Sequence, residues 1–122
     1  MYEIESYKTA NGKDEILEYL TALGKKAQTD KSARILTKKI DLYFRLLRKN
    51  GTRIGMPVTR YIVKGIWELR PLDERFLFAY WAHNTFIFLN RFQKKGNKTP
   101  KLKIEQAERN LKDWLERNND NG

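Results

Sequence analysis

Lysine side chains gather where a strand-like segment passes into a basic turn. Residues 86–100 read FIFLNRFQKKGNKTP, so an apolar run is followed closely by Lys94, Lys95 and Lys98. Cations held between a strand and a following helix are typical of sites that bind phosphate, because helix starts and basic side chains both attract anions. A solvated basic turn has the same composition, and this segment alone does not distinguish the two.

The chemistry open to such cations is cleavage of RNA by its own 2′-hydroxyl. That reaction needs a base for the hydroxyl, positive charge at the phosphorus and a proton for the departing 5′-oxygen. The only histidine, His83, falls in an expected hairpin tip, so a pair of histidines is excluded. Crowding by cations lowers the pKa of lysine, whereas arginine stays charged. We therefore predict that Arg70 and Arg75 bind the phosphate and that Lys94 or Lys95 transfers the proton.

Glu68 has two interpretations, a general base near the 2′-hydroxyl or a structural partner that holds Arg70 or Arg75. We favour the structural interpretation but keep Glu68 among the candidate catalytic residues. No metal site and no cofactor are expected, because the chain has one histidine, no cysteine and no cluster of acidic residues. The residues predicted to bind RNA are Arg60, Lys64, Arg91, Gln93 and Lys98.

Strand alternation predicts which of these side chains share a face of a sheet. In residues 86–93, the even positions remain apolar or neutral up to Phe92, whereas the odd positions turn polar at Arg91 and Gln93. We therefore assign Phe92 to a buried face, and Tyr80 likewise, while Trp67 is expected in the core. The more polar, open face is expected to carry Glu68, Arg70, Arg75, Arg91, Gln93 and Lys95.

Two helices are expected to precede these strands as a hairpin. Apolar residues at helical spacing predict one helix over residues 13–27, capped by Thr9 or Asn11, and a second from Asp30 or Ser32 to residue 49. A short strand at residues 2–7 comes before them. The short polar link between the helices predicts that they lie antiparallel.

The rest of the chain predicts a meander and a last helix. Residues 52–64 contain Pro57 and indicate a loop with at most one short strand; Thr99 is expected to cap the last helix, with Pro100 as its first residue. This gives an α+β domain with helices on one face of an antiparallel sheet and the order β-α-α-β-β-β-α. The expected strands are 65–70, 75–82 and 86–93, the last helix is 99–117, and residues 118–122 are expected to fray.

The composition limits the partners and the compartment. The chain has 122 residues, no cysteine and a net charge of +10, and we expect one domain over residues 1–122. No apolar run approaches 18 residues, so we expect a cytoplasmic protein without a membrane segment. Six basic residues and no acid lie between Asp41 and Glu68, and seven basic residues and no acid lie between Glu74 and Glu105. Such one-signed stretches favour an anionic partner.

The motif residues resemble the RelE/HigB/ParE superfamily of toxins, and most closely its HigB-like, phage-derived branch. The shared pattern is a GIWELR strand, an arginine in the next strand, then F-x-K-K-x-x-K-T-P and a helix that begins near IEQA. Many relatives have histidine where this chain has Asn90, so a histidine acid or base is not implied here. The corresponding residues are Gly65 to Arg70, Arg75, Phe92, Lys94, Lys95, Lys98, Thr99, Pro100 and Ile104 to Ala107.

The resemblance implies a RelE-like fold and the toxin of a type II toxin–antitoxin pair. It further implies a ribosome-dependent endoribonuclease that cuts mRNA, and a HigA-like antitoxin with a helix-turn-helix domain in a complex expected to be a heterotetramer. Two alternatives remain open: a ParE-type inhibitor of gyrase, and a binding module that only neutralises nucleic-acid phosphates. The cation cluster favours the nuclease over the gyrase inhibitor, because gyrase inhibition needs no phosphate chemistry.

Overall fold

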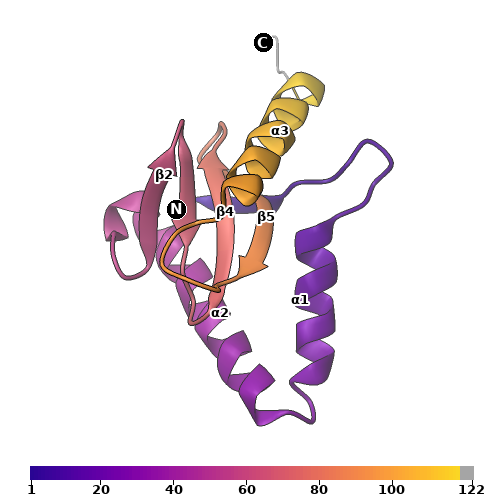
Figure 1. Cartoon of the computed structure of the whole chain (residues 1–122), viewed down its shortest axis with the longest axis vertical. Coiled ribbons are helices and arrows are strands. Elements are labelled where there is room, and N and C mark those ends of the chain that lie inside the picture. The colour runs from indigo at the N-terminus through magenta and orange to yellow at the C-terminus, as the bar shows by residue number, and fades with distance from the viewer. Residues whose placement is uncertain (119–122) are drawn as a thin grey trace.

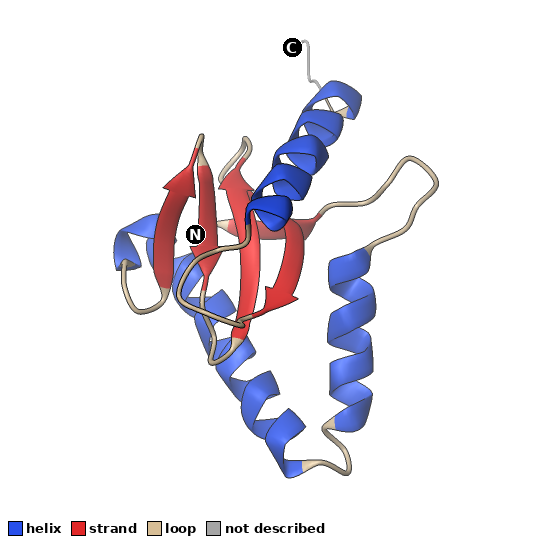
Figure 2. Ribbon diagram, in the orientation of Figure 1, coloured by secondary structure: helices blue, strands red, loops and turns tan. Residues whose placement is uncertain are grey.

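The computed structural model describes residues 1–118, and the predicted frayed end lies outside the described residues from position 119 onwards. In these residues, three α-helices and a five-stranded sheet make up an α+β fold (Figures 1 and 2). No helix in this part of the chain is long and apolar enough to cross a membrane. The elements are β1 Glu3–Ser6, α1 Glu15–Lys26, α2 Lys31–Asn50, a 3₁₀ helix Gly51–Ile54, β2 Thr59–Val63, β3 Ile66–Leu69, β4 Glu74–Tyr80, β5 Thr85–Gln93 and α3 Lys101–Arg117.

The sheet has the order β1-β5-β4-β3-β2 and is mixed. β2 to β5 form the antiparallel meander, but β1 pairs with β5 in parallel, from Glu3 opposite Thr85 to Ser6 opposite Phe88. The prediction of a purely antiparallel sheet was therefore wrong at one edge. A parallel neighbour requires a long crossover, and here the helical hairpin and the meander supply it. The meander also has one strand more than expected, since β2 lies in the segment predicted to be mainly loop.

Aspartates begin the first two helices. Asp14 caps α1 by accepting a hydrogen bond from the Leu17 N–H at 2.9 Å, so the predicted cap at Thr9 or Asn11 was wrong. The Thr9 hydroxyl instead accepts from the Lys13 N–H within the preceding turn. The predicted start of α2 at Asp30 is confirmed, because its carboxylate accepts from the Ala33 N–H at 3.1 Å.

Both faces of the sheet are covered, which corrects the expectation that the helices share one face (Figure 2). On one side the α1–α2 hairpin packs Ile16, Ile40 and Leu47 against Phe76 and Phe88 of the sheet. On the other side α3 packs Ala107 and Trp114 against strand residues including Leu77, Ile87 and Leu89. The predicted apolar stripes of all three helices thus build two separate cores, one on each face.

A β-bulge in β5 changes which residues share a face. Leu77 pairs with Asn90, but the next residue of β4, Phe78, pairs with Phe88, so Leu89 is the extra residue. Leu89 and Asn90 both turn towards α3: Leu89 lies in the α3-side core, and the Asn90 amide donates hydrogen bonds to α3, to the Lys103 carbonyl and the Gln106 side chain. Beyond the bulge the parity of β5 is the reverse of the predicted one.

Candidate functional site

The Glu68 carboxylate stands at the centre of a group of cations. Glu68 lies on β3 with 2% of its side chain exposed, and its Oε1 atom is 3.3 Å from Arg70 Nε, 3.6 Å from Arg60 Nη2 and 3.9 Å from Arg75 Nε. Its Oε2 atom accepts a hydrogen bond of 2.7 Å from the Thr99 hydroxyl. We call these five residues the Glu68 cluster; they come from β2, β3 and its end, β4, and the loop before α3.

Strand register explains how the sequence brings the cluster together. Arg60 is opposite Glu68, and Glu68 is opposite Leu77, so all three point to the α3 side of the sheet. Arg70 and Arg75 lie two residues from Glu68 and Leu77 respectively and therefore share that face. Arg60 was predicted only to bind RNA, because a prediction of mainly loop for residues 52–64 gave it no partner on a neighbouring strand.

Arg75 is fixed within the cluster. It is 6% exposed, and its Nη1 group donates hydrogen bonds to the carbonyls of Leu72 at 2.7 Å and Glu74 at 2.8 Å. Burial, and then the nearby charge of Arg70, lowers the pKa of the Arg75 guanidinium. The prediction that Arg75 lies on an open face was wrong, because the side chain is buried. Glu68 and the two carbonyls hold the guanidinium in one position.

The lysine-rich loop between β5 and α3 closes over the cluster. In Figure 1 the orange segment after β5 passes across the sheet before α3 begins. The Lys94 N–H donates to the Asp73 carbonyl at 2.7 Å, and Thr99 is bound at the other end. The cavity beneath measures about 10 Å³, which is room for roughly one water molecule. The loop and strand residues that line it with the cluster are Phe92, Lys94, Gly96, Asn97 and Lys98.

Thr99 does not cap the last helix as predicted. Pro100 is the cap residue of α3 and makes no side-chain capping bond, so the predicted roles of both residues were wrong. The Thr99 hydroxyl instead donates to Glu68 and accepts a hydrogen bond of 3.1 Å from Arg60 Nη2. The K-T-P motif marked this position, but its spacing indicated a helix start and gave no sign of a bond to the sheet.

Arg91 and Gln93 lie on the opposite face, which corrects their predicted place beside Glu68. The bulge turns both residues towards the α1 side, where Arg91 Nη2 is 2.9 Å from the Glu74 carboxylate and its guanidinium lies 3.9 Å from the centre of the Tyr19 ring. Gln93 is opposite Glu74 and exposed. The same reversal places Lys94, and not Lys95, in the lining of the cavity.

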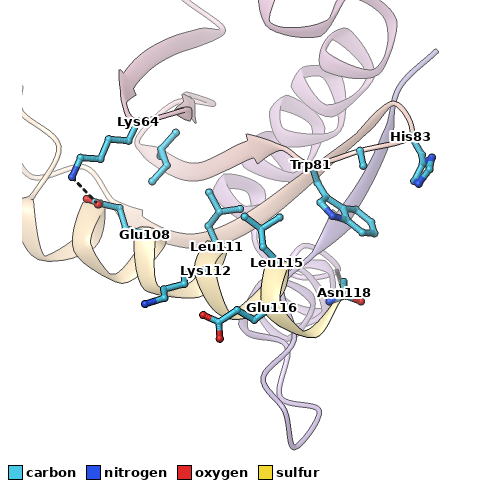
Figure 3. Close-up of a pocket in the computed structure, with 11 residues that line it drawn as sticks. Lys64, Trp81, His83, Glu108, Leu111, Lys112, Leu115, Glu116 and Asn118 are labelled. Carbon is cyan, nitrogen blue, oxygen red and sulfur yellow. Dashed lines mark hydrogen bonds and ion pairs between the residues drawn. The ribbon is translucent and has the colours of Figure 1, made fainter. Parts of the chain in front are cut away.

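Lys64 and His83 line a separate groove of about 850 Å³ beside α3 (Figure 3). Lys64 Nζ is 3.5 Å from the Glu108 carboxylate of α3, and His83 lies in the β4–β5 turn. Figure 3 shows Leu111 and Leu115 pointing from α3 towards the strands, with Trp81 nearby. Lys64 is thus placed away from the cavity that the Glu68 cluster lines. Tyr80, predicted on a buried face, is 52% exposed because it is the last residue of β4.

The chain is similar to a known protein family over most of its length. The family described as Phage derived protein Gp49-like (DUF891) matches residues 18–112, a span that includes the entire Glu68 cluster and the lysine-rich loop. No curated protein matches the chain. Since the match covers most of its length, the chain belongs to the phage-derived Gp49-like family, a branch of the RelE/HigB-like toxins.

Proposed function

We propose that this protein is the toxin of a type II toxin–antitoxin pair and acts as a ribosome-dependent endoribonuclease that cleaves mRNA. The observation that carries the proposal is the Glu68 cluster, in which three guanidinium groups surround one buried carboxylate and two lysines line the same cavity. The formal charge of these six groups is positive, so the arrangement favours an anion such as an RNA phosphate.

The cluster supplies positive charge that is held in place before substrate arrives. The carbonyls of Leu72 and Glu74, together with Glu68, orient Arg75, and the buried Nε atom of Arg70 lies 3.3 Å from Glu68 Oε1. Donors fixed in this way stabilise charge that develops on a phosphate more effectively than mobile surface cations. In our proposal Arg70 and Arg75 therefore face the phosphate, and Glu68 acts by holding them.

The lysine-rich loop supplies the proton transfer in this proposal. As the 2′-oxygen bonds to phosphorus and the 5′-oxygen leaves, one proton departs from the 2′-hydroxyl and one is delivered to the 5′-oxygen. Both lysines are exposed, but Lys94 is the better candidate for one of these transfers because it lines the cavity and Lys95 does not. The closed cavity is too small for a phosphate, so the RNA binds at its mouth or displaces the loop.

The roles of the other residues predicted to bind RNA now depend on where each residue lies relative to the cavity. Lys98 lines the cavity and Arg60 belongs to the cluster, so both are proposed to contact the RNA backbone. Lys64 and Gln93 are more distant in the fold and would contact only flanking RNA or ribosome. Arg91 is proposed to stabilise the fold, since its guanidinium is already paired with Glu74 and Tyr19.

The proposed partner is a HigA-like antitoxin with a helix-turn-helix domain, bound in a heterotetramer in the cytoplasm. A protein of net charge +10 attracts an acidic surface, and opposite charges accelerate capture. The complex is therefore expected to form more slowly at high salt.

Brief induction in cells without antitoxin tests the function. We expect growth and protein synthesis to stop, and newly formed mRNA 5′ ends to fall at codon-related positions within translated frames. The Lys94→Ala, Lys98→Ala double variant should lose this effect. DNA damage with continued protein synthesis would support a gyrase inhibitor instead, and arrest without new mRNA ends would support a non-catalytic binding module.

A further inference from the structure

We infer that Thr99 is a positioning residue, whose hydroxyl bridges Arg60 and Glu68 and so fixes the lysine-rich loop over the guanidinium groups. The inference rests on the proposed function and deepens it. The bridge consists of the 2.7 Å bond that Thr99 donates to Glu68 Oε2 and the 3.1 Å bond that it accepts from Arg60 Nη2.

The bridge restricts the lysine-rich loop because Thr99 lies at the end of that loop. The loop leaves β5 at Lys94, whose N–H is bound to the Asp73 carbonyl, and it reaches α3 at Lys101. Thr99 therefore binds the far end of the loop to the sheet, so the loop is held at Lys94 and at Thr99, and Lys98 lies between these two points. A loop held at both ends has fewer conformations available, so Lys94 and Lys98 spend more time over the cavity.

The hydrogen-bonding capacity of the Thr99 hydroxyl also suits its two neighbours, Arg60 and Glu68. Glu68 Oε1 lies near the three guanidinium groups, while Oε2 accepts the hydrogen bond from the Thr99 hydroxyl, so each carboxylate oxygen has its own partners. A hydroxyl donates one hydrogen bond and still accepts another, which a cation at this position does not. Thr99 can therefore bind an arginine and a glutamate at once without adding charge to the cluster.

Three variants separate a positioning role from a general loss of stability. Thr99→Val keeps the shape and removes the hydroxyl, Thr99→Ser keeps the hydroxyl, and Thr37→Val is the matched control. The Thr37 hydroxyl donates to the Ala33 carbonyl at 2.8 Å within α2, so its loss also removes one intramolecular hydrogen bond but leaves the loop untouched.

Cleavage of mRNA on purified translating ribosomes gives the kinetic measurement, carried out well below the melting temperature of each variant. Because small displacements of reacting groups cost up to about 100-fold in rate, we expect Thr99→Val to lower kcat by roughly 10- to 100-fold with a smaller change in KM. Thr99→Ser should restore most of kcat, and Thr37→Val should match the parent. Unchanged kcat in Thr99→Val, or a higher kcat, would overturn the inference.

Hydrogen exchange of the loop amides, residues 94–99, tests the bridge without any cleavage. Faster exchange in Thr99→Val, but not in Thr99→Ser or Thr37→Val, is expected; equal exchange in all three would overturn the bridge. If the parent cuts no RNA while Thr99→Val still loosens the loop, the proposed function fails and the bridge stands. A parent that cuts RNA, with a Thr99→Val variant that is equal to it in exchange and in kcat, overturns only the role of Thr99.

Discussion

Lys94 and Lys95 are neighbours in the chain but face different surroundings. Both side chains are exposed, but Lys94 lines the cavity beneath the loop and Lys95 does not. We predict that Lys94→Ala lowers the cleavage rate by roughly 100- to 1000-fold, the typical effect of losing one preorganised donor. Lys95→Ala makes the same change of charge and serves as the control, with an expected effect of only a few-fold. Both variants should melt at the parental temperature.

The rates are measured on purified ribosomes, and folding is checked by circular dichroism. Equal losses in the two variants would mean that the loop contributes only general positive charge. A larger loss in Lys95→Ala would assign the proton transfer to Lys95.

Glu68→Gln separates the two interpretations of the central carboxylate. Removing one partner from a buried group of charges is expensive because the remaining charges lose their compensation, and we predict a fall of about 3 to 5 kcal/mol in the free energy of unfolding. Urea unfolding at pH 7 measures this change. A variant that is as stable as the parent yet cuts no RNA would instead identify Glu68 as the general base.

Arg75→Ala tests the buried arginine, which strand parity alone placed on an open surface. The substitution leaves the carbonyls of Leu72 and Glu74 without the Arg75 donor, and buried groups without partners cost about 1 to 3 kcal/mol. We therefore predict loss of both stability and cleavage, in contrast to Lys94→Ala, which should lose cleavage alone. An Arg75→Ala protein with the parental melting temperature and cleavage rate would contradict both roles.

The residue types at the site were predictable, but their contacts were not. The GIWELR strand, the arginine of the next strand and the lysine-rich turn before Pro100 identified Glu68, Arg70, Arg75 and the lysines as candidates. The bond from Thr99 to Glu68 joins residues 31 positions apart. Sequence spacing carries no information on where a loop crosses a sheet, so the hydroxyl was interpreted as an ordinary helix cap.

At the scale of elements, a network of Tyr19, Glu74 and Arg91 joins α1 to the sheet. The Arg91 guanidinium lies over the Tyr19 ring and pairs with Glu74. Burial, and then the charge of Glu74, raises the pKa of Tyr19 from 10.0 to about 12. The folded chain therefore keeps the Tyr19 proton at a pH at which the unfolded chain releases it.

This difference predicts a specific pH dependence. The contribution of Tyr19 is fully present below its unfolded pKa of 10.0 and is lost as the pH rises towards about 12. Tyr19→Phe removes the titrating group, so its stability should decline less than that of the parent between pH 10 and 12. Urea unfolding at pH 8, 10 and 11 measures how the free energy of unfolding changes with pH in the parent and in Tyr19→Phe. Identical slopes in the two proteins would show that Tyr19 titrates alike in the folded and the unfolded chain.

The bulge in β5 explains why a correct prediction of the strand gave the wrong faces. Alternation holds from Thr85 to Phe88, but one extra residue at Leu89 reverses it for Arg91 and Gln93. The sequence at this point, FLNRF, changes from apolar to polar whether or not a bulge is present, so it does not indicate the bulge. The bulge depends on how β5 pairs with β4 and packs against α3, which is tertiary information. The helices were easier to predict because their apolar stripes are local.

At the scale of the molecule, charge should set how strongly RNA binding depends on salt. Each phosphate neutralised on a single strand contributes about 0.7 to the slope of log affinity against log salt. We predict that the Lys94→Ala, Lys98→Ala double variant lowers this slope by about 1.4, measured with a 2′-O-methyl RNA that resists cleavage. Lys38→Ala, Lys39→Ala, which removes two cations from α2, is the control. An unchanged slope in the loop variant would exclude phosphate contacts by both loop lysines.

The parallel pairing of β1 with β5 has a consequence for synthesis of the chain. Glu3 lies opposite Thr85 and Ser6 opposite Phe88, so β1 has no partner until β5, the last strand of the described residues, has been made. Pairing across such sequence separation is slow, because the loop entropy is lost before the contacts form. Thr99, which completes the Glu68 cluster, emerges later still. A nascent chain therefore carries an incomplete site until Thr99 has been made and has reached the sheet, which delays the proposed cleavage until after that point.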